Sequence, residues 1–135
     1  MRSQGQRANQ NGQTAEIVIS AVLLQKRLIA VRQYPVGDGI FHTPIKVDFY
    51  LPPMPGYRTG LIIESKWQEV SGSADEKLPY LVANIQTCFP SPTIIVIDGS
   101  GFRPGAVAWL YRQVGGNLLA VQNMREFVTW CNQTF

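Results

Sequence analysis

Apolar residues near the start of the chain recur at helical spacing. They fall on one stripe, at steps of three and four residues: Ile17, Val18, Ala21, Leu24 and Leu28. Because such steps bring side chains to one face of a helix, the stripe predicts a helix over residues 14 to 29, with Asn11 or Thr14 as its cap. Residues 1 to 10 are polar, and we expect them to form a flexible tail.

Strand patterns follow this helix. Residues 45 to 51 alternate, which predicts a strand with Val47, Phe49 and Leu51 on one face and the polar side chains on the other. Residues 61 to 68 are predicted to form the next strand. A short strand over 30 to 34 and a loop rich in glycine and proline precede both of them.

The second half of the chain alternates between helix and strand. Ser73 and Glu76 have capping-box spacing for a helix that continues to about Thr87, although Pro79 is unfavourable inside it. The remaining elements are predicted to be a strand over 93 to 98, a helix over 105 to 114, a strand over 117 to 121 and a helix over 124 to 132. The apolar run TIIVID at 93 to 98 suits a central strand that is covered on both faces.

This order of elements predicts an α/β chain with a central mixed β-sheet flanked by helices. Its 135 residues fit a single domain, which we place at residues 11 to 135. No apolar run reaches the roughly 18 residues that a membrane helix needs, so no membrane association is expected. Two scattered cysteines, Cys88 and Cys131, make no disulfide framework, and we expect a cytoplasmic protein with reduced thiols.

The net charge of +3 is a mild basic bias that is unevenly distributed. All of the excess lies in the first 47 residues, ahead of Asp48 and Glu64, and includes Arg2, Arg7 and Lys46. Basic residues placed in this way could grip the phosphates of DNA. An ordinary solvated surface explains the charge equally well.

Two carboxylates interrupt the apolar residues of neighbouring predicted strands. Asp48 lies between Val47 and Phe49, and Glu64 follows a run of apolar residues. A carboxylate in such a place is unfavourable unless it is paired or bound to a cation. Strand geometry puts Glu64, Lys66 and Gln68 on one side. If the two strands pair, two hard oxygen ligands converge beside a lysine, and such ligands favour Mg²⁺.

The alternative for Glu64 and Lys66 is a simple ion pair on an exposed strand, which contributes little. Asp38 competes with Asp48 for the role of the first carboxylate, but its surroundings, VGDGI, favour a turn.

The segments VDFYL, GLIIESKWQ and SADEKLPYLVANI resemble the PD-(D/E)XK nucleases, the restriction-endonuclease-like superfamily. The resemblance extends from Gly12 to Ile97 in the order of the elements, although Val47 stands where the motif has proline. It implies a restriction-endonuclease-like core in which Asp48, Glu64 and Lys66 are catalytic and the two acids bind metal. It also implies that Glu16, on the first helix, joins the site, while a first-turn acid that favours the helix dipole is the alternative. Gln68 could extend the site.

The function expected from these residues is a metal-dependent endonuclease of restriction, homing or repair type. It would hydrolyse phosphodiester bonds in double-stranded DNA with Mg²⁺, for which Mn²⁺ may substitute, and with Lys66 assisting the attacking water. The alternative is a non-catalytic DNA-binding or assembly subunit on the same fold. Cutting both strands is most simply done by two copies, so a homodimer or a dimer of dimers is expected. The closing helix could supply its apolar interface, through Met124, Phe127, Val128 and Trp130, or could cover the sheet.

Overall fold

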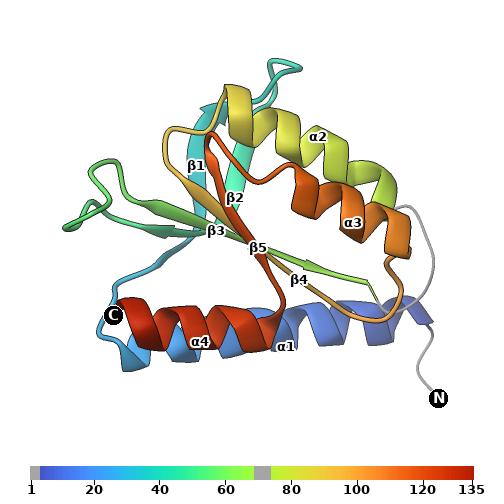
Figure 1. The fold of residues 1–135 in the computed structure, drawn as a ribbon, viewed down its shortest axis with the longest axis horizontal. Helices are drawn as coiled ribbons and strands as arrows, with labels where there is room; N and C mark the ends of the chain where they lie inside the picture. Colours follow the sequence, from blue (N-terminus) through green and yellow to red (C-terminus); the bar gives the residue numbers. More distant parts are fainter. Residues whose placement is uncertain (1–3, 69–73) are drawn as a thin grey trace.

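The computed structural model describes residues 4 to 68 and 74 to 135, with side chains from Gln13 onward and excluding that of Ala74. Its elements alternate between helix and strand along the chain (Figure 1). In chain order they are α1 (Gln4–Gln25), β1 (Val31–Asp38), β2 (Pro44–Leu51), β3 (Leu61–Trp67), α2 (Ala74–Thr87), β4 (Thr93–Asp98), α3 (Pro104–Arg112), β5 (Leu118–Gln122) and α4 (Met124–Thr134).

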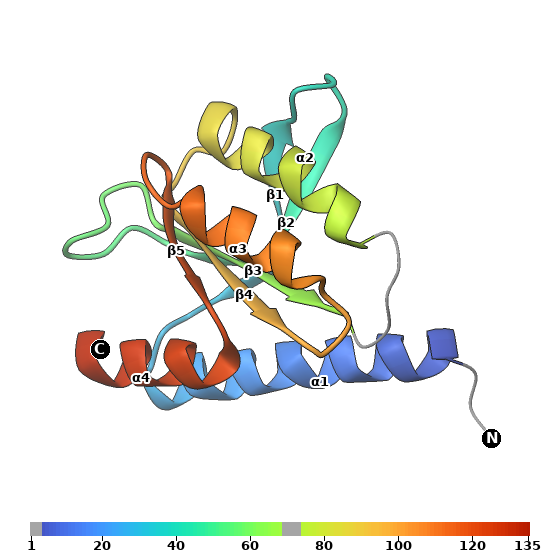
Figure 2. The same ribbon diagram turned by 45° about the vertical axis from the view of Figure 1, so that its right-hand side comes forward.

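The strands form one mixed sheet in the order β1-β2-β3-β4-β5. Strands β1, β2 and β3 pair antiparallel, because short connections join them. Strands β3, β4 and β5 pair parallel, because α2 and α3 provide the crossovers. Helices α2 and α3 cover one face of the sheet, and α1 and α4 cover the other (Figures 1 and 2). The predicted α/β architecture, a central mixed sheet flanked by helices, is confirmed.

Each face of the sheet has its own hydrophobic core. Ile95 and Ile97 of β4 pack with residues of α2 and α3, whereas Ile94 and Val96 pack with residues of α1 and α4. The continuous apolar run therefore marks a central strand that is buried on both faces, as its sequence predicted.

Helix α1 differs from the prediction in its bounds and in its buried face. It begins at Gln4, so it includes residues 4 to 10 of the segment predicted to form a tail. Glutamine and arginine are good helix formers, and a polar helical segment leaves no apolar period to detect. The buried residues are Ala15, Ile19 and Leu23, while Ile17 and Leu24 are 65% and 74% exposed.

The end of α1 is set by backbone hydrogen bonds around Arg27, which adopts φ 58°. The Arg27 amide donates to the Leu24 carbonyl, and the Leu28 amide donates to the Leu23 carbonyl. This left-handed cap ends the helix four residues before the predicted end at residue 29.

Strand β1 continues to Asp38, beyond the predicted end at residue 34, and pairs with β2 as a hairpin. Pro35 is tolerated because β1 is an edge strand, where a missing amide hydrogen need not break a ladder. Helix α2 includes Pro79. The predicted cap at Ser73 lies outside the described residues.

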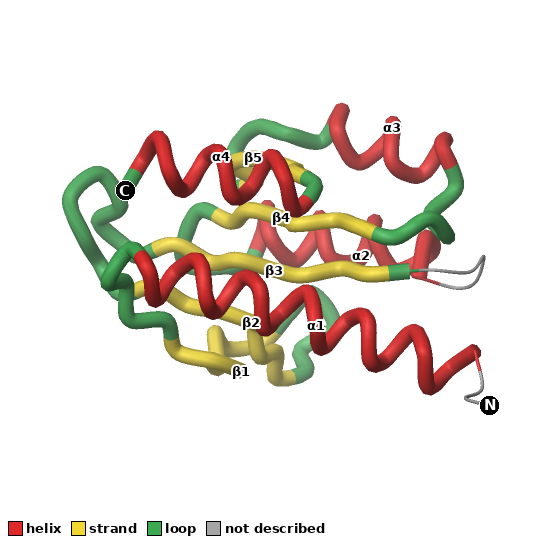
Figure 3. The backbone as a smooth tube through the Cα atoms, turned by 90° about the horizontal axis from the view of Figure 1, so that it is seen from below, coloured by secondary structure: helices red, strands yellow, loops and turns green. Residues whose placement is uncertain are grey.

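Helix α4 covers the sheet. Figure 3 shows α1 and α4 lying across the same face. Phe127 and Cys131 are fully buried there, with Met124 and Trp130 packed against the same core. These side chains are therefore engaged within the chain. None of the helices in the described ranges is long and apolar enough to cross a membrane.

Candidate active site

The backbone ladder between β2 and β3 ends where the two candidate carboxylates begin. Phe49 pairs with Ile63, and the next pair in register would be Asp48 with Glu64. Here side chains replace the ladder: the Asp48 amide donates to Glu64 Oε1 at 2.8 Å, and the Ser65 amide donates to Asp48 Oδ2 at 2.8 Å. Each carboxylate is thus held by the backbone of the opposite strand, and the two predicted acids are brought together.

The side-chain alternation of β2 breaks at the same point. Val47 packs in the core under α2 and α3, whereas Phe49 packs in the core against α1 and α4. The prediction that these two residues share a face is therefore wrong. Regular alternation requires a regular ladder, and the carboxylates interrupt it at Asp48.

Glu64 is a buried carboxylate with one cationic partner. Its side chain is 6% exposed, and Lys66 Nζ lies 3.5 Å from its Oε2. Burial, and then the neighbouring Asp48 charge, raise the pKa of Glu64 to about 7, although Lys66 and the Asp48 amide act in the opposite direction. Desolvation and a like charge both disfavour the ionised form. The surroundings of Glu64 therefore compensate its negative charge only in part.

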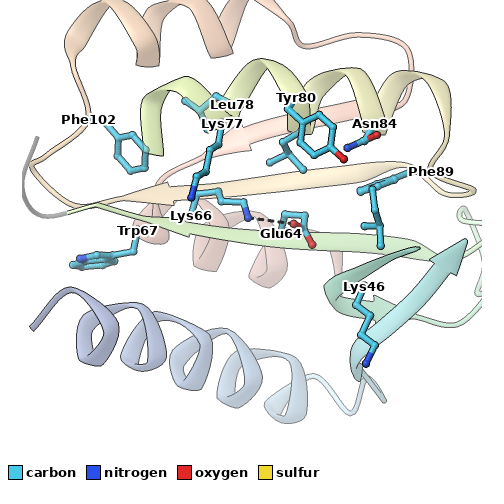
Figure 4. Close-up of a pocket in the computed structure, with 12 residues that line it drawn as sticks. Lys46, Glu64, Lys66, Trp67, Lys77, Leu78, Tyr80, Asn84, Phe89 and Phe102 are labelled. Atoms are coloured by element: carbon cyan, nitrogen blue, oxygen red, sulfur yellow. Dashed lines mark ion pairs between the residues drawn. The ribbon is translucent and has the colours of Figure 1, made fainter. Parts of the chain in front are cut away.

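A cavity of about 300 Å³ opens beside Glu64, between the sheet and α2. Its lining combines a carboxylate, three lysines and a large apolar surface: Ile45, Lys46, Glu64, Lys66, Trp67, Lys77, Leu78, Tyr80, Leu81, Asn84, Phe89 and Phe102. The Glu64 carboxylate and the Lys66 ammonium meet within it (Figure 4). A ligand in this cavity would therefore touch two of the predicted catalytic residues, Glu64 and Lys66, whereas Asp48 is not part of the lining.

The three lysines of the lining occupy different places. The Lys66 ammonium points toward Glu64, and Lys77 extends from α2 toward the sheet, whereas Lys46 points away from Glu64 (Figure 4). Sequence reasoning missed Lys77. The signal was its position beside Leu78 and four residues before Leu81, on the side of the helix that faces the sheet.

Gln68 is engaged at the end of β3 and does not line the cavity. It is 6% exposed, and its amide nitrogen donates to Asp75 Oδ1 at 3.2 Å and to the Gly101 carbonyl at 2.9 Å. Asp75 also pairs with Arg103 at 3.4 Å. Gln68 therefore ties β3 to the beginnings of α2 and α3.

Glu16 lies on the α1 side and is not brought to the cavity. Its Oε1 accepts from Arg32 at 3.0 Å, and the Arg32 guanidinium stacks over the Phe49 ring at 4.5 Å. Asp38, at the end of β1, is exposed and does not line the cavity either.

The predicted N-terminal DNA contacts have no described side chains. Arg2 lies outside the described residues. Arg7 belongs to α1, but its side chain is outside the described part.

Gln33 is a neighbour of Asp48 that sequence reasoning missed. Its backbone adopts φ 51°, a conformation that residues other than glycine rarely take. Its side-chain Nε2 donates to Asp48 Oδ1 at 3.5 Å. Strand β1 brings it there, because Arg32 pairs with Phe49 and Tyr34 with Val47. A glutamine on a polar edge strand carries no sequence signal for this contact.

The donors at this site suit a hard divalent cation. Asp48 and Glu64 offer carboxylate oxygens close together, and Glu64 is buried with a raised pKa. Within residues 4 to 68 and 74 to 135, no three His, Cys, Asp or Glu side chains form a metal-holding group. Carboxylate oxygens are the ligands that hard divalent cations prefer.

Comparison with protein families adds independent information. The family model described as a PD-(D/E)XK nuclease superfamily domain matches residues 7–135. Comparisons with curated proteins and with solved structures give no match. The family match extends beyond the segments that carry the sequence resemblance, through α3, β5 and α4 to the end of the chain.

Proposed function

Because the chain belongs to the PD-(D/E)XK nuclease superfamily, we propose that it is a metal-dependent endonuclease that hydrolyses phosphodiester bonds in DNA. The observation that carries this proposal is the meeting of two carboxylates and a lysine beside one cavity, which Glu64 and Lys66 line and Asp48 does not. Asp48 and Glu64 are bridged through the strand backbones, and Lys66 lies 3.5 Å from Glu64.

In this proposal Asp48 and Glu64 hold Mg²⁺, for which Mn²⁺ can substitute. The bound ion would stabilise negative charge on the phosphate. Backbone amides already fix both carboxylates, so their orientation does not depend on the ion. Gln33 supports Asp48 from the edge strand.

Lys66 has the position for a second role. Its side chain is 38% exposed, so the ammonium can reach a phosphate or a water in the cavity while it stays next to Glu64. There it orients the attacking water and compensates charge as the water loses its proton. Lys66 therefore acts on the nucleophile, while the two acids would hold the ion that stabilises charge on the phosphate.

A non-catalytic DNA-binding or assembly subunit on the same fold is the alternative. The raised pKa of Glu64 argues for catalysis, because burying that carboxylate destabilises the metal-free fold. A merely structural position would be better filled by an apolar residue or by an amide. A strongly perturbed acid in a cavity is typical of a functional site.

The proposed working unit on double-stranded DNA is two copies or a pair of dimers. One site built from Asp48, Glu64 and Lys66 cuts one strand at a time, and a two-fold axis would place a second site on the other strand. Light scattering coupled to size exclusion tests this part. A mass of one chain, 15.1 kDa, both free and on DNA, would restrict the protein to cutting single strands.

We propose a cytoplasmic setting. Cys88 and Cys131 are free thiols, and burial raises the pKa of Cys131 to about 11. A buried thiol that stays protonated is chemically inert. Such cysteines are consistent with a reducing compartment, and mass spectrometry after thiol alkylation of protein from lysed cells tests their redox state.

The test of the proposed activity is incubation with supercoiled plasmid. The purified protein should convert it to nicked or linear DNA in Mg²⁺ or Mn²⁺ and leave it intact in chelator. A Glu64→Gln variant should be inactive, whereas Glu76→Gln, which changes an exposed carboxylate on α2, should cut normally. DNA binding without cutting under all metal conditions would favour the non-catalytic alternative.

A further inference from the structure

We propose that the cavity beside Glu64 receives an unpaired nucleotide, so that the preferred substrate is DNA that is single-stranded at the point of cleavage. A flap, an overhang or a frayed end would supply such a strand. The preference in cleavage rests on the proposed nuclease function. The binding of an unpaired nucleotide can be measured separately, without cleavage.

The shape and lining of the cavity suit one base. Its volume of about 300 Å³ lies at the small end of the range typical of ligand pockets, about 300–1,000 Å³. Leu78, Leu81, Phe89 and Phe102 give it apolar walls, and Glu64 lies at the sheet. A base inside a duplex is stacked and paired, so it can enter such a cavity only after leaving the stack. An unpaired base enters without that cost.

An exposed aromatic ring stands next to the cavity. Phe41 is 71% exposed, and one side of its ring stacks on Tyr80 with centroids 5.1 Å apart and an interplanar angle of 21°. Tyr80 itself lines the cavity. A ring that is supported on one side and open to solvent can stack with a base, and every base has a face for such stacking.

The loop that carries Phe41 is fastened to α2, so the ring is positioned before a ligand arrives. The Ile40 amide donates to Asn84 Oδ1 at 2.8 Å, and Asn84 is 2% exposed. Gly39 lies so close to Ile45 and Asn84 that a Cβ atom there would clash with both side chains. A preformed platform loses little conformational freedom on binding, which favours affinity.

The charge around the cavity suits the phosphates on either side of the base. Lys46, Lys66 and Lys77 are basic lining residues, and Glu64 is the one acidic residue in the lining. Lys66 pairs with Glu64, whereas Lys46 and Lys77 form no ion pair within the described residues. Aromatic stacking combined with lysines along a groove is the usual way in which single strands are bound.

The alternative role of Phe41 is to fasten the hairpin by packing on Tyr80. Substitutions separate the two roles. Phe41→Leu keeps an apolar contact with Tyr80 but has no ring, and Phe41→Trp keeps a ring. Tyr111→Ala is the matched control, because Tyr111 is a 41% exposed aromatic residue on α3 that does not line the cavity.

The experiment measures fluorescence anisotropy in chelator, with a fluorescein-labelled oligodeoxynucleotide offered as a single strand and as a blunt duplex. The wild type should bind the single strand more tightly. Phe41→Ala and Phe41→Leu should each weaken single-strand binding about tenfold and leave duplex binding unchanged, since stacking on one aromatic ring contributes an effect of this order. Phe41→Trp and Tyr111→Ala should match the wild type.

Each contrary result has a distinct meaning. Equal wild-type affinity for the two DNA forms would overturn the binding of an unpaired nucleotide in the cavity, and wild-type binding by Phe41→Leu would overturn the stacking of that nucleotide on Phe41. Continued cutting of plasmid in Mg²⁺ would then leave the proposed nuclease function intact. Conversely, ring-dependent binding of single strands without cleavage of any DNA would contradict the nuclease function and support the cavity.

Discussion

Replacing Glu64 by glutamine removes a charge that the metal-free protein holds in a buried place. Glutamine keeps an oxygen that can accept from the Asp48 amide, so the bridge between β2 and β3 can persist. It removes the repulsion from Asp48, and it also removes the ion pair with Lys66. The pKa of Glu64 combines the effects of burial, of the Asp48 charge, of Lys66 and of the Asp48 amide on the ionised carboxylate. We expect Glu64→Gln to stabilise the metal-free protein above neutral pH.

The magnitude follows from the shift in the pKa. The pKa of Glu64 is raised from 4.5 to about 7, and each unit corresponds to about 1.4 kcal/mol, so the full effect is about 3 kcal/mol. Because the folded-state pKa lies above the unfolded value, the contribution of Glu64 to stability is full below pH 4.5 and is lost as the pH rises through 7. The advantage of Glu64→Gln should therefore grow between pH 5 and 7 and then level off.

Urea unfolding in chelator at pH 5, 6, 7 and 8 measures this difference. The exposed carboxylate of Glu76 supplies the control, because Glu76→Gln makes the same change in net charge. A difference in unfolding free energy between wild type and Glu64→Gln that is independent of pH would show that burial does not raise the pKa of Glu64. So would a wild type that becomes the more stable of the two above pH 7.

Three further predictions test other parts of the account. Asp48→Asn should abolish Mg²⁺ binding measured by calorimetry and should keep or improve DNA binding in chelator, because it removes a negative charge near phosphate; unchanged metal affinity would exclude Asp48 as a ligand. Asn117→Ala should lower the unfolding free energy by about 2 kcal/mol, because the Asn117 amide donates to the carbonyls of Ile85, Phe89 and Ser91; a change below about 0.5 kcal/mol would contradict this role. DNA affinity measured between low and physiological salt should fall steeply, because basic side chains must displace counterions; a flat dependence would argue against a DNA-binding surface.

The strands were predictable because their patterns are local. Residues 93 to 98 form a continuous apolar run, and β4 has those same bounds. Helix α1 was predicted less well. Its polar first residues carry no period, and Ile17 and Leu24 are apolar but exposed. Which apolar residues a helix buries depends on how it rotates against the sheet, and this is a tertiary property.

The central part of the site was also predictable, because alternation along β3 puts Glu64 and Lys66 on one side. The rest depends on contacts between distant segments. Gln33 reaches Asp48 through the hairpin, and Lys77 reaches the cavity through the packing of α2. Alternation would place Gln68 on the same side as Glu64. Hydrogen bonds to Asp75 and Gly101 instead hold its side chain at the end of the strand. Alternation along a strand tells which side of the sheet a side chain faces. The residues that it contacts there are decided by the packing of distant segments.

In the proposed mechanism, Lys66 acts in metal-dependent cleavage beside Asp48 and Glu64. The most direct test compares the rates at which wild type, Lys66→Ala and Lys26→Ala nick supercoiled plasmid in Mg²⁺. Lys26 is the matched control, since it does not line the cavity. Lys66→Ala should retain the wild-type circular dichroism spectrum but lose cleavage, while Lys26→Ala should cut at the wild-type rate. Equal rates for wild type and Lys66→Ala would contradict the role of Lys66 in cleavage.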